Sequence, residues 1–299
     1  MQPTALAEHL TATYGIEVER VTLIESVHRV DRVDGAPWIA RVFPSERPVE
    51  AAEGDAEILR FLEEHDYPAE RVAAPSPVSV LDGRAVLVTE LVEGTNGRPD
   101  RRPETFRALG DLLGRLQTLP EAGGALARPA GSWHHLSKAG GARSEDVAAL
   151  DALLVEPHHA PLRDELTTID LLDDLPHALL HPDFSTPNAM LTPDGPVLID
   201  WTGAGRGPRV AGLGLLLAGC AGVVGAVDAV VDGYALHVTL EPDEVDRLGG
   251  AIRQFGLVLD CWTAVFHPGT CDHIVAALPD NRARAEALAD KARAALAAR

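Results

Sequence analysis

The pattern of apolar and polar positions divides the chain into a shorter part rich in strands and a longer part rich in helices. Within residues 1–93, the segments 18–26, 27–33 and 37–43 have the β-branched, partly alternating pattern of strands. The pair Asp34 and Gly35 predicts a hairpin turn between the second and third segments. These strands therefore begin an antiparallel sheet.

One helix and two further strands complete this part. Residues 48–66 carry apolar side chains at the spacing of an amphipathic helix, with Pro48 near its start. Residues 77–94 contain two strands joined by a second turn, at Asp82 and Gly83. The order predicts a small antiparallel five-stranded sheet with one helix.

From residue 94 onward the pattern is mainly helical. Residues 123–141 are loop-like, and helices are expected at residues 104–119, 146–154, 163–175, 244–266 and 282–299. The fold class is therefore α+β, with an N-terminal lobe at 1–93 and a larger helical C-terminal lobe at 94–299. Clefts between two such lobes are favoured ligand sites.

Composition limits the possible partners. The 299 residues are 46% hydrophobic, enough for a sizeable core. There are 26 basic and 45 acidic residues, and the formal charge of -19 argues against nucleic acid or an anionic membrane surface as a partner. Such a charge suits a cationic substrate, although an acidic surface mainly confers solubility.

The cysteines and the apolar segments indicate a cytoplasmic protein. Cys220, Cys261 and Cys271 are widely spaced, without a CxxC or zinc pattern, as expected of small apolar residues in a reducing compartment. The first residues have no basic and apolar regions of a secretion signal. Residues 210–227 lack charge, but their five glycines and the following Asp228 favour a helix buried in the domain over a membrane span.

The segment HPDFSTPNAMLTPDGPVLID, residues 181–200, concentrates polar side chains between Pro and Gly. As a structural turn, its Pro and Asx residues need no further role, and Asp194 in the PDG turn is assigned to turn chemistry. As a zinc site, His177, His181 and Asp183 would be the ligands. That pattern is weak, because the residues between the histidines are apolar and Pro182 interrupts strand geometry.

A third interpretation uses the spacing of Asp183, Asn188 and Asp200. Phosphoryl transfer from a nucleotide needs a carboxylate near the acceptor hydroxyl and oxygen ligands for Mg²⁺ at the phosphates. A loop with Asp and, five positions later, Asn, followed by a hairpin that returns with a second Asp, supplies these groups.

HPDFSTPNAMLTPDGPVLIDW resembles the catalytic segment of the aminoglycoside phosphotransferase family, a group of kinase-like small-molecule phosphotransferases. That family usually has His-Gly-Asp, four residues, Asn, and a strand ending Ile-Asp-Trp or Ile-Asp-Phe. Here Pro182 takes the Gly position, and residues 199–201 match. The resemblance implies a bilobal protein-kinase-like fold and transfer of the γ-phosphate of ATP or GTP to a hydroxyl of a small molecule, such as an aminoglycoside-like antibiotic or a metabolite.

The resemblance also assigns the nucleotide contacts. Arg41, in the strand IARVF, occupies the position of the cation that reaches the phosphates, and Asp55, or alternatively Glu57, that of its acidic partner on the helix. The carbonyl of Glu90 and the amide of Val92 occupy the hinge that holds adenine. The chain has no GK[ST] sequence, which excludes a P-loop.

The same resemblance gives roles to the catalytic segment. Asp183 accepts or orients the proton of the substrate hydroxyl, and Asn188 and Asp200 bind Mg²⁺. His181 is expected to be a scaffold that fixes the loop. The expected partners are thus a nucleotide and a small hydroxylated substrate, with no nucleic acid and no membrane.

Several departures from the family pattern open an alternative. The turn between the first two strands has no Gly, which leaves Ser26 and backbone amides to cover the phosphates. After Asp200, an acid usually present is replaced by Gly212, while Arg206 and Arg209 are added. The alternative is a nucleotide-binding regulatory pseudokinase without turnover.

Substrate contacts in this family come from the helical lobe. Asp260 is the main acidic candidate, whereas Asp170, Asp173 and Asp174 are expected to form a solvated face. Gln117 stands where the family often has His, on a helix that we interpret as part of the core.

Overall fold

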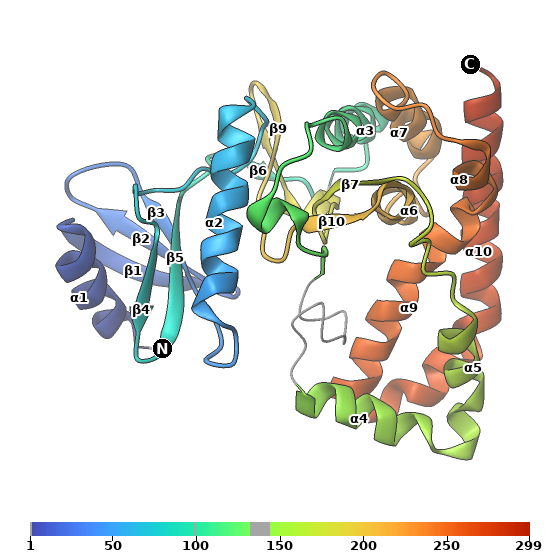
Figure 1. Cartoon of the computed structure of the whole chain (residues 1–299), viewed down its shortest axis with the longest axis horizontal. Coiled ribbons are helices and arrows are strands. Elements are labelled where there is room, and N and C mark those ends of the chain that lie inside the picture. The colour runs from blue at the N-terminus through green and yellow to red at the C-terminus, as the bar shows by residue number, and fades with distance from the viewer. Residues whose placement is uncertain (1, 99, 132–143) are drawn as a thin grey trace. The chain divides into compact units, whose positions relative to one another are not determined.

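The computed structural model describes residues 2–98, 100–131 and 144–299 (Figure 1). The chain forms two compact units, Met1–Thr95 with Met190–Thr202, and Asn96–Ala189 with Gly203–Arg299. The chain first passes from one unit to the other between Thr95 and Asn96, and the sequence interpretation placed the start of the second lobe at residue 94. Residues 190–202 belong to the first unit, although the sequence interpretation placed them in the second.

The first unit is built on the predicted antiparallel sheet of five strands, in the order β1-β2-β3-β5-β4. The strands are β1 (Val18–Ile24), β2 (Val27–Arg32), β3 (Trp38–Val42), β4 (Val78–Leu81) and β5 (Arg84–Glu90). This sheet, with the predicted helix α2 (Val49–Glu64), confirms the expected fold of the N-terminal part.

One of the two turns predicted from a DG pair is a tight two-residue turn, and the other is not. Asp82 and Gly83 both have positive φ, 50° and 73°, as a two-residue turn between β4 and β5 requires. The turn between β1 and β2 also has two residues, Glu25 and Ser26, and contains no glycine. Pairing of β2 with β3 ends at Trp38, so the DG pair there lies in a longer loop and not in a tight turn.

The two helices of this unit cover opposite faces of the sheet (Figure 1). Helix α1 (Pro3–Tyr14), which the sequence pattern did not predict, packs its leucines against Val86 and Val88 of β5. The alternate residues Leu87 and Thr89 face a small cavity that α2 also lines. The second face of the sheet is therefore where α2 meets polar side chains.

A short hairpin completes the first unit. Strands β8 (Ala189–Thr192) and β9 (Gly195–Leu198) form a three-stranded sheet with β6 (Thr95–Asn96). Leu198, at the end of β9, makes a parallel bridge with Ala69, in the segment that follows α2. This bridge fixes the chain just before Asp200.

The second unit is mainly helical, as predicted. Its helices are α3 (Pro103–Gln117), α4 (Ser144–Leu154), α5 (Ala160–Thr168), α6 (Arg209–Ala218), α7 (Ala226–Tyr234), α8 (Pro242–Asp246), α9 (Leu248–Phe266) and α10 (Cys271–Ala297). Strands β7 (His177–Leu180) and β10 (Gly205–Pro208) form an antiparallel pair. Between these elements lie 3-10 turns at Gly124–Ala127, Pro157–His159, Thr186–Asn188 and Pro268–Thr270.

Some helical boundaries differ from the prediction. The helix expected at 163–175 ends at Thr168, and Leu172 has a positive φ of 62°. The apolar segment 210–227 forms α6, a turn with positive φ at Gly222 and Gly225, and the start of α7, instead of one buried helix. Among the described residues, no helix is long and apolar enough to cross a membrane. Of the loop expected at 123–141, residues 132–141 lie outside the described part.

Candidate active site

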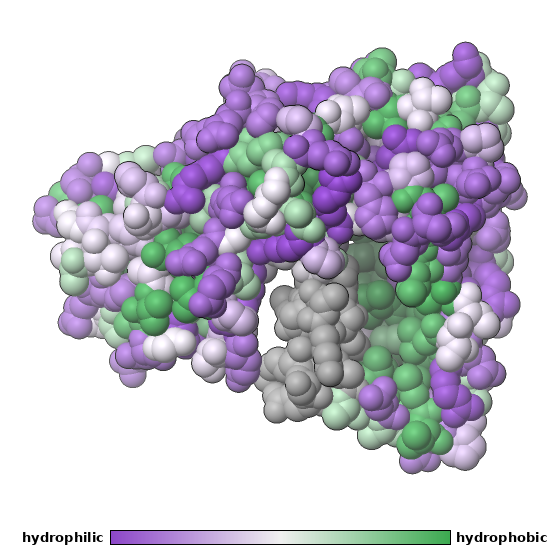
Figure 2. Space-filling view, in the orientation of Figure 1, coloured by the Kyte–Doolittle hydropathy of each residue, from purple (hydrophilic) through white to green (hydrophobic). Residues whose placement is uncertain are grey.

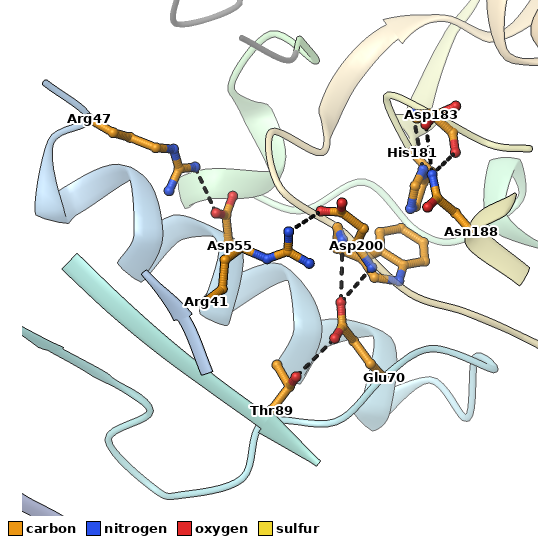
Figure 3. Close-up of polar contacts among 10 residues, drawn as sticks. Arg41, Arg47, Asp55, Glu70, Thr89, His181, Asp183, Asn188 and Asp200 are labelled. Carbon is orange, nitrogen blue, oxygen red and sulfur yellow. Dashed lines mark hydrogen bonds and ion pairs between the residues drawn. The ribbon is translucent and has the colours of Figure 1, made fainter. Parts of the chain in front are cut away.

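A short loop after β7 holds Asp183 by both carboxylate oxygens, and Figure 3 shows the bonds from Asn188. Ser185 Oγ donates to Oδ1 at 2.9 Å, and Asn188 Nδ2 donates to Oδ2 at 2.8 Å. The same Nδ2 lies 3.0 Å from the backbone oxygen of Asp183. The 3-10 turn at Thr186–Asn188 folds the chain back, so that a residue five positions later reaches the aspartate.

His181 supports this loop from inside the second unit. Its side chain is 2% exposed, and its Nδ1 accepts the backbone N–H of Asp183 at 3.1 Å. The ring also makes an edge-to-face contact with Phe184. These contacts hold the backbone of the loop, which is the scaffold role expected from the sequence.

The loop offers oxygen donors of the kind that Mg²⁺ prefers. Asn188 uses its Nδ2 on Asp183, so its Oδ1 is the atom suited to a cation. The carboxylate of Asp183 is partly exposed and already oriented. The residues present therefore fit a magnesium ion next to an oriented carboxylate.

In the first unit, the expected phosphate-binding cation and the expected metal ligand lie side by side. Arg41 Nη1, from β3, is 3.2 Å from Asp200 Oδ1, which follows the end of β9 (Figure 3). The side chain of Arg41 is 19% exposed and that of Asp200 is 37% exposed. The pair thus remains accessible to a ligand on the Asp200 side.

Glu70 is a member of this cluster that the sequence analysis missed. It is buried, and it accepts hydrogen bonds from Thr89 Oγ1 at 2.9 Å and from the backbone N–H of Asp200 at 2.7 Å. Burial raises the pKa of the Glu70 carboxyl, a shift that the nearby Arg41 opposes and the like charge of Asp200 reinforces. No local pattern near Glu70 signals this position.

The two acids on α2 differ in their surroundings. Asp55 is buried, forms an ion pair with Arg47 at 2.7 Å, and lines the same small cavity as Arg41. Glu57 is exposed. Asp55 thus shares a cavity with Arg41, but its ion pair is with Arg47, and that of Arg41 is with Asp200. The sequence indicated neither of these two ion pairs.

The other predicted nucleotide contacts lie at or beyond the ends of strands. Ser26 is exposed in the two-residue turn between β1 and β2. Glu90 is the last residue of β5, and its backbone N–H donates to the carbonyl of Arg71. Val92 follows two residues later in the connection to β6.

The zinc interpretation is not favoured by the structure. His177 is exposed, with its Nε2 near the carbonyl of Asp173, whereas His181 is buried and bonded to the amide of Asp183. In the described part of the chain, a group of three His, Cys, Asp or Glu side chains close enough to hold a metal occurs elsewhere, at His158, His159 and Asp272. Asp272, at the start of α10, is brought to the two histidines by the fold.

The residues that depart from the family pattern after Asp200 have structural contacts. Arg209 bonds both oxygens of the fully buried Glu244, at 2.8 and 2.5 Å. Arg206 pairs with Glu121 at 2.6 Å. Gln117 joins the carbonyl of Arg209 to the hydroxyl of Tyr234, which places it in the core as predicted.

Acidic side chains of the helical unit fall into two groups. Asp170 and Asp174 both pair with Arg247, so they are tied to the protein itself. Asp260 lies in a cavity of about 180 Å³ between α9 and α10, and burial raises its pKa. Figure 2 shows a hollow lined by hydrophobic residues on one face of this unit.

The profile of the phosphotransferase enzyme family (APH) matches residues 23–247. The chain belongs to this family. It is therefore an enzyme of the small-molecule kinase and phosphotransferase class. No curated protein matches the chain.

Solved structures show the same fold at low sequence identity. An amicoumacin kinase, hAmiN, in complex with AMP-PNP, Ca²⁺ and Ami, is 16% identical with a TM-score of 0.66, over 96% of this chain and 95% of that one. A microcompartment-associated aminopropanol kinase is 17% identical with a TM-score of 0.64, over 99% of both. The aminoglycoside phosphotransferase APH(3'')-Id from Streptomyces rimosus is 21% identical with a TM-score of 0.59, over 87% of this chain and 98% of that one. The predicted kinase-like fold is thus confirmed.

Proposed function

We propose that this phosphotransferase moves the γ-phosphate of ATP or GTP to a hydroxyl of a small molecule in the presence of Mg²⁺. Asp183 orients the acceptor hydroxyl and takes its proton. Asn188 Oδ1 and the carboxylate of Asp200 hold the metal, which when bound neutralises charge on the phosphates. Arg41 binds phosphate through its guanidinium, which is suited to bidentate contacts.

The proposal divides these tasks along the chain. The lobe of residues 1–93 would bind nucleotide through Arg41, supported by Asp55, with Ser26 near the phosphates and the backbone of Glu90 and Val92 at the base. The lobe of residues 94–299 would supply the catalytic loop and the acceptor pocket. We place the enzyme in the cytoplasm, where nucleotide donors are available and its three buried cysteines stay free.

The observation that carries the proposal is the double hydrogen bond from Asn188 to Asp183. It orients one carboxylate and leaves an amide oxygen for a metal, which are the two requirements of the catalytic loop in phosphoryl transfer. In support, an amicoumacin kinase of similar fold is described with AMP-PNP and Ca²⁺.

Several observations bear on the acceptor. Similar folds occur in an aminopropanol kinase and an aminoglycoside phosphotransferase, both named for amine compounds. The chain has a formal charge of -19, and Asp260 lies in a cavity of the helical unit. We therefore propose a hydroxylated, cationic acceptor, such as an amino alcohol or an aminoglycoside-like compound.

The test is nucleotide consumption with a panel of aminoglycosides, macrolides and amino alcohols, using ATP and GTP in parallel. Asp183→Asn should lower turnover by about 10²- to 10⁴-fold, the usual contribution of a general base. Asp194→Asn is the matched control, because Asp194 is an exposed turn residue in the hairpin that follows. Equal turnover in both variants would refute the role of Asp183.

The second candidate is a regulatory protein that binds Mg-nucleotide without turnover. It is favoured by the turn at Glu25 and Ser26, which has two residues and no glycine to approach the phosphates closely. Binding of Mg-nucleotide with no transfer to any acceptor would support this candidate and exclude the first.

A further inference from the structure

The carboxylate of Glu70 accepts hydrogen bonds from three donors, which lie in two separate segments of the first unit. Its Oε2 accepts the hydroxyl of Thr89 on β5 at 2.9 Å. Its Oε1 accepts the backbone N–H of Asp200 at 2.7 Å, with the N–H of Trp201 at 3.4 Å (Figure 3). An ionised carboxylate is an acceptor only, so it suits a set made entirely of donors.

The residue held in this way has an unusual backbone. Asp200 has a φ of 65°, in the left-handed region that residues other than glycine rarely adopt. Such a conformation persists where the surrounding structure fixes it. The peptide N–H groups on both sides of the Asp200 Cα point to Glu70, while the Asp200 carboxylate lies at Arg41.

Glu70 is itself held in register with the end of β9. Its backbone N–H donates to the carbonyl of Leu198 at 2.9 Å, and the N–H of Leu198 donates to the carbonyl of Pro68 at 3.0 Å. Trp201 is buried and makes an edge-to-face contact with Tyr67, in the same segment. The glutamate and the aspartate are therefore parts of one rigid local unit.

The position of Glu70 excludes direct contact with a nucleotide. The side chain is buried, and the cavity beside it has a volume of about 10 Å³, room for about one water molecule. A phosphate group or a hydrated metal ion does not fit there. Glu70 can thus act on a ligand only through its neighbours, and its direct hydrogen bonds in the site go to the backbone of Asp200 and Trp201.

We propose that Glu70 is a positioning residue, which sets the backbone of Asp200 so that its carboxylate is directed to the metal of the nucleotide. The inference rests on the proposed function, because that function makes Asp200 a metal ligand. Groups that orient a metal ligand typically contribute about 10- to 100-fold to metal affinity.

Two substitutions separate geometry from charge. Glu70→Gln keeps the side-chain length: its oxygen accepts the two backbone N–H groups, and its amide donates to the hydroxyl of Thr89. Glu70→Asp keeps the charge, but it is one methylene shorter and withdraws the carboxylate from Asp200. Positioning predicts that the aspartate variant is impaired and the glutamine variant is not.

The first measurement is amide hydrogen exchange of residues 199–203 in the protein without metal or nucleotide. Glu70→Asp should exchange at least about 10-fold faster there than the wild type, and Glu70→Gln within about threefold. The second is the Mg²⁺ concentration that half-saturates binding of AMP-PNP. It should rise about 10- to 100-fold in Glu70→Asp and stay within about threefold in Glu70→Gln.

A double mutant tests whether the effect passes through Asp200. In an Asp200→Asn background, Glu70→Asp should cause no further loss of Mg²⁺ dependence. If Glu70→Asp does not fold, Thr89→Val replaces it: this variant removes the hydroxyl that orients the carboxylate, and it should raise the Mg²⁺ requirement about fivefold.

Three outcomes would overturn the proposal. The first is that Glu70→Asp, or Thr89→Val in its place, keeps the amide exchange and the Mg²⁺ dependence of the wild type. The others are that Glu70→Gln is as impaired as Glu70→Asp, or that the losses in Mg²⁺ dependence caused by the Glu70 and Asp200 substitutions add in the double mutant. Failure of the proposed function looks different, because the wild type would then transfer phosphate to no acceptor, or would bind AMP-PNP without any dependence on Mg²⁺. In that event the exchange measurement still decides whether Glu70 holds Asp200.

Discussion

Replacing Arg209 with methionine removes the cation that faces a fully buried carboxylate. Arg209 Nε and Nη2 bond the two oxygens of Glu244, whose side chain is 0% exposed, and Nη2 also bonds the carbonyl of Thr239. The pKa of Arg209 is raised, mainly by its hydrogen bond to Glu244. Methionine keeps an unbranched apolar stem, is shorter than arginine, and removes the charge and all of the donors.

The expected cost follows from the charge left behind. Breaking a buried ion pair by removing one partner costs about 3–5 kcal/mol, a large part of a typical stability of about 5–15 kcal/mol. Glu244→Gln in the same chain removes the unpaired charge but keeps an oxygen for the backbone N–H of Glu241, with which Glu244 forms a capping box. We expect the double variant to recover about 2–3 kcal/mol of the loss.

Urea unfolding of the wild type, both single variants and the double variant gives the coupling energy at pH 7. In the proposed enzyme, the double variant should also keep turnover, because Arg209 contacts the start of α8 and not the catalytic loop. The reasoning is refuted if Arg209→Met costs less than about 1 kcal/mol, or if the folded double variant loses turnover.

Three further predictions concern packing, charge and nucleotide binding. Gly110→Ala should destabilise the folded protein by more than about 3 kcal/mol, because the new Cβ would lie 2.2 Å from the backbone oxygen of Val230. Gly256→Ala, where a Cβ would meet nothing within 4 Å, should stabilise α9 by up to about 1 kcal/mol. Thermal unfolding of the two variants measures both effects. Asp170, whose pKa is lowered by Arg247, stabilises the folded state above its unfolded pKa, so Asp170→Asn should cost about 0.5–1 kcal/mol at pH 7. In urea titrations this difference should begin to shrink as the pH falls below about 4, and it should vanish only below the lowered pKa of the folded state. Arg41→Ala should raise the KM for the nucleotide at least about 10-fold, as measured by initial rates, while the Tm stays within about 3 °C of the wild type. An unchanged KM would show that Arg41 does not bind the phosphates.

The strands of the first unit were predictable because their signals are local. Alternation with a period of two marked β1 to β5, and the DG pair at Asp82 and Gly83 marked the β4–β5 turn. Helix α1 was missed, because only Leu6 and Leu10 of its residues are buried, and so narrow an apolar stripe gives a weak helical signal.

The helix predicted at 163–175 was too long for a reason that is also local. Asp170 accepts the backbone N–H of Leu172 at 3.0 Å, an alternative to the helical hydrogen bond. The same aspartate is then drawn to Arg247, 77 positions later in the chain. A tertiary ion pair and a side-chain turn together outweigh the helical spacing of the leucines.

In the candidate site, too, contacts between residues close in sequence were predictable, and contacts between distant segments were not. Asp183 and Asn188 are five positions apart, and their spacing alone placed both on one loop, where they are in fact hydrogen-bonded. Glu70 is 130 positions from Asp200 and lies in no motif, so only the parallel bridge between Ala69 and Leu198 brings it there. Contacts of this kind depend on the folded register of two segments and leave no pattern in either one.

The hydrogen bonds that orient the Asp183 carboxylate also help to decide between an enzyme and a regulatory protein. In the proposed enzyme, binding of Mg-nucleotide would require the proposed metal ligands Asn188 and Asp200, but it would place no demand on the carboxylate of Asp183. That carboxylate is nevertheless oriented by Ser185 and Asn188 together, and its backbone N–H is bonded to a buried histidine. A general base needs such fixed geometry, because proton transfer depends on hydrogen-bond reach to the acceptor. The arrangement around Asp183 therefore favours turnover over nucleotide binding alone, even with a phosphate turn that lacks glycine.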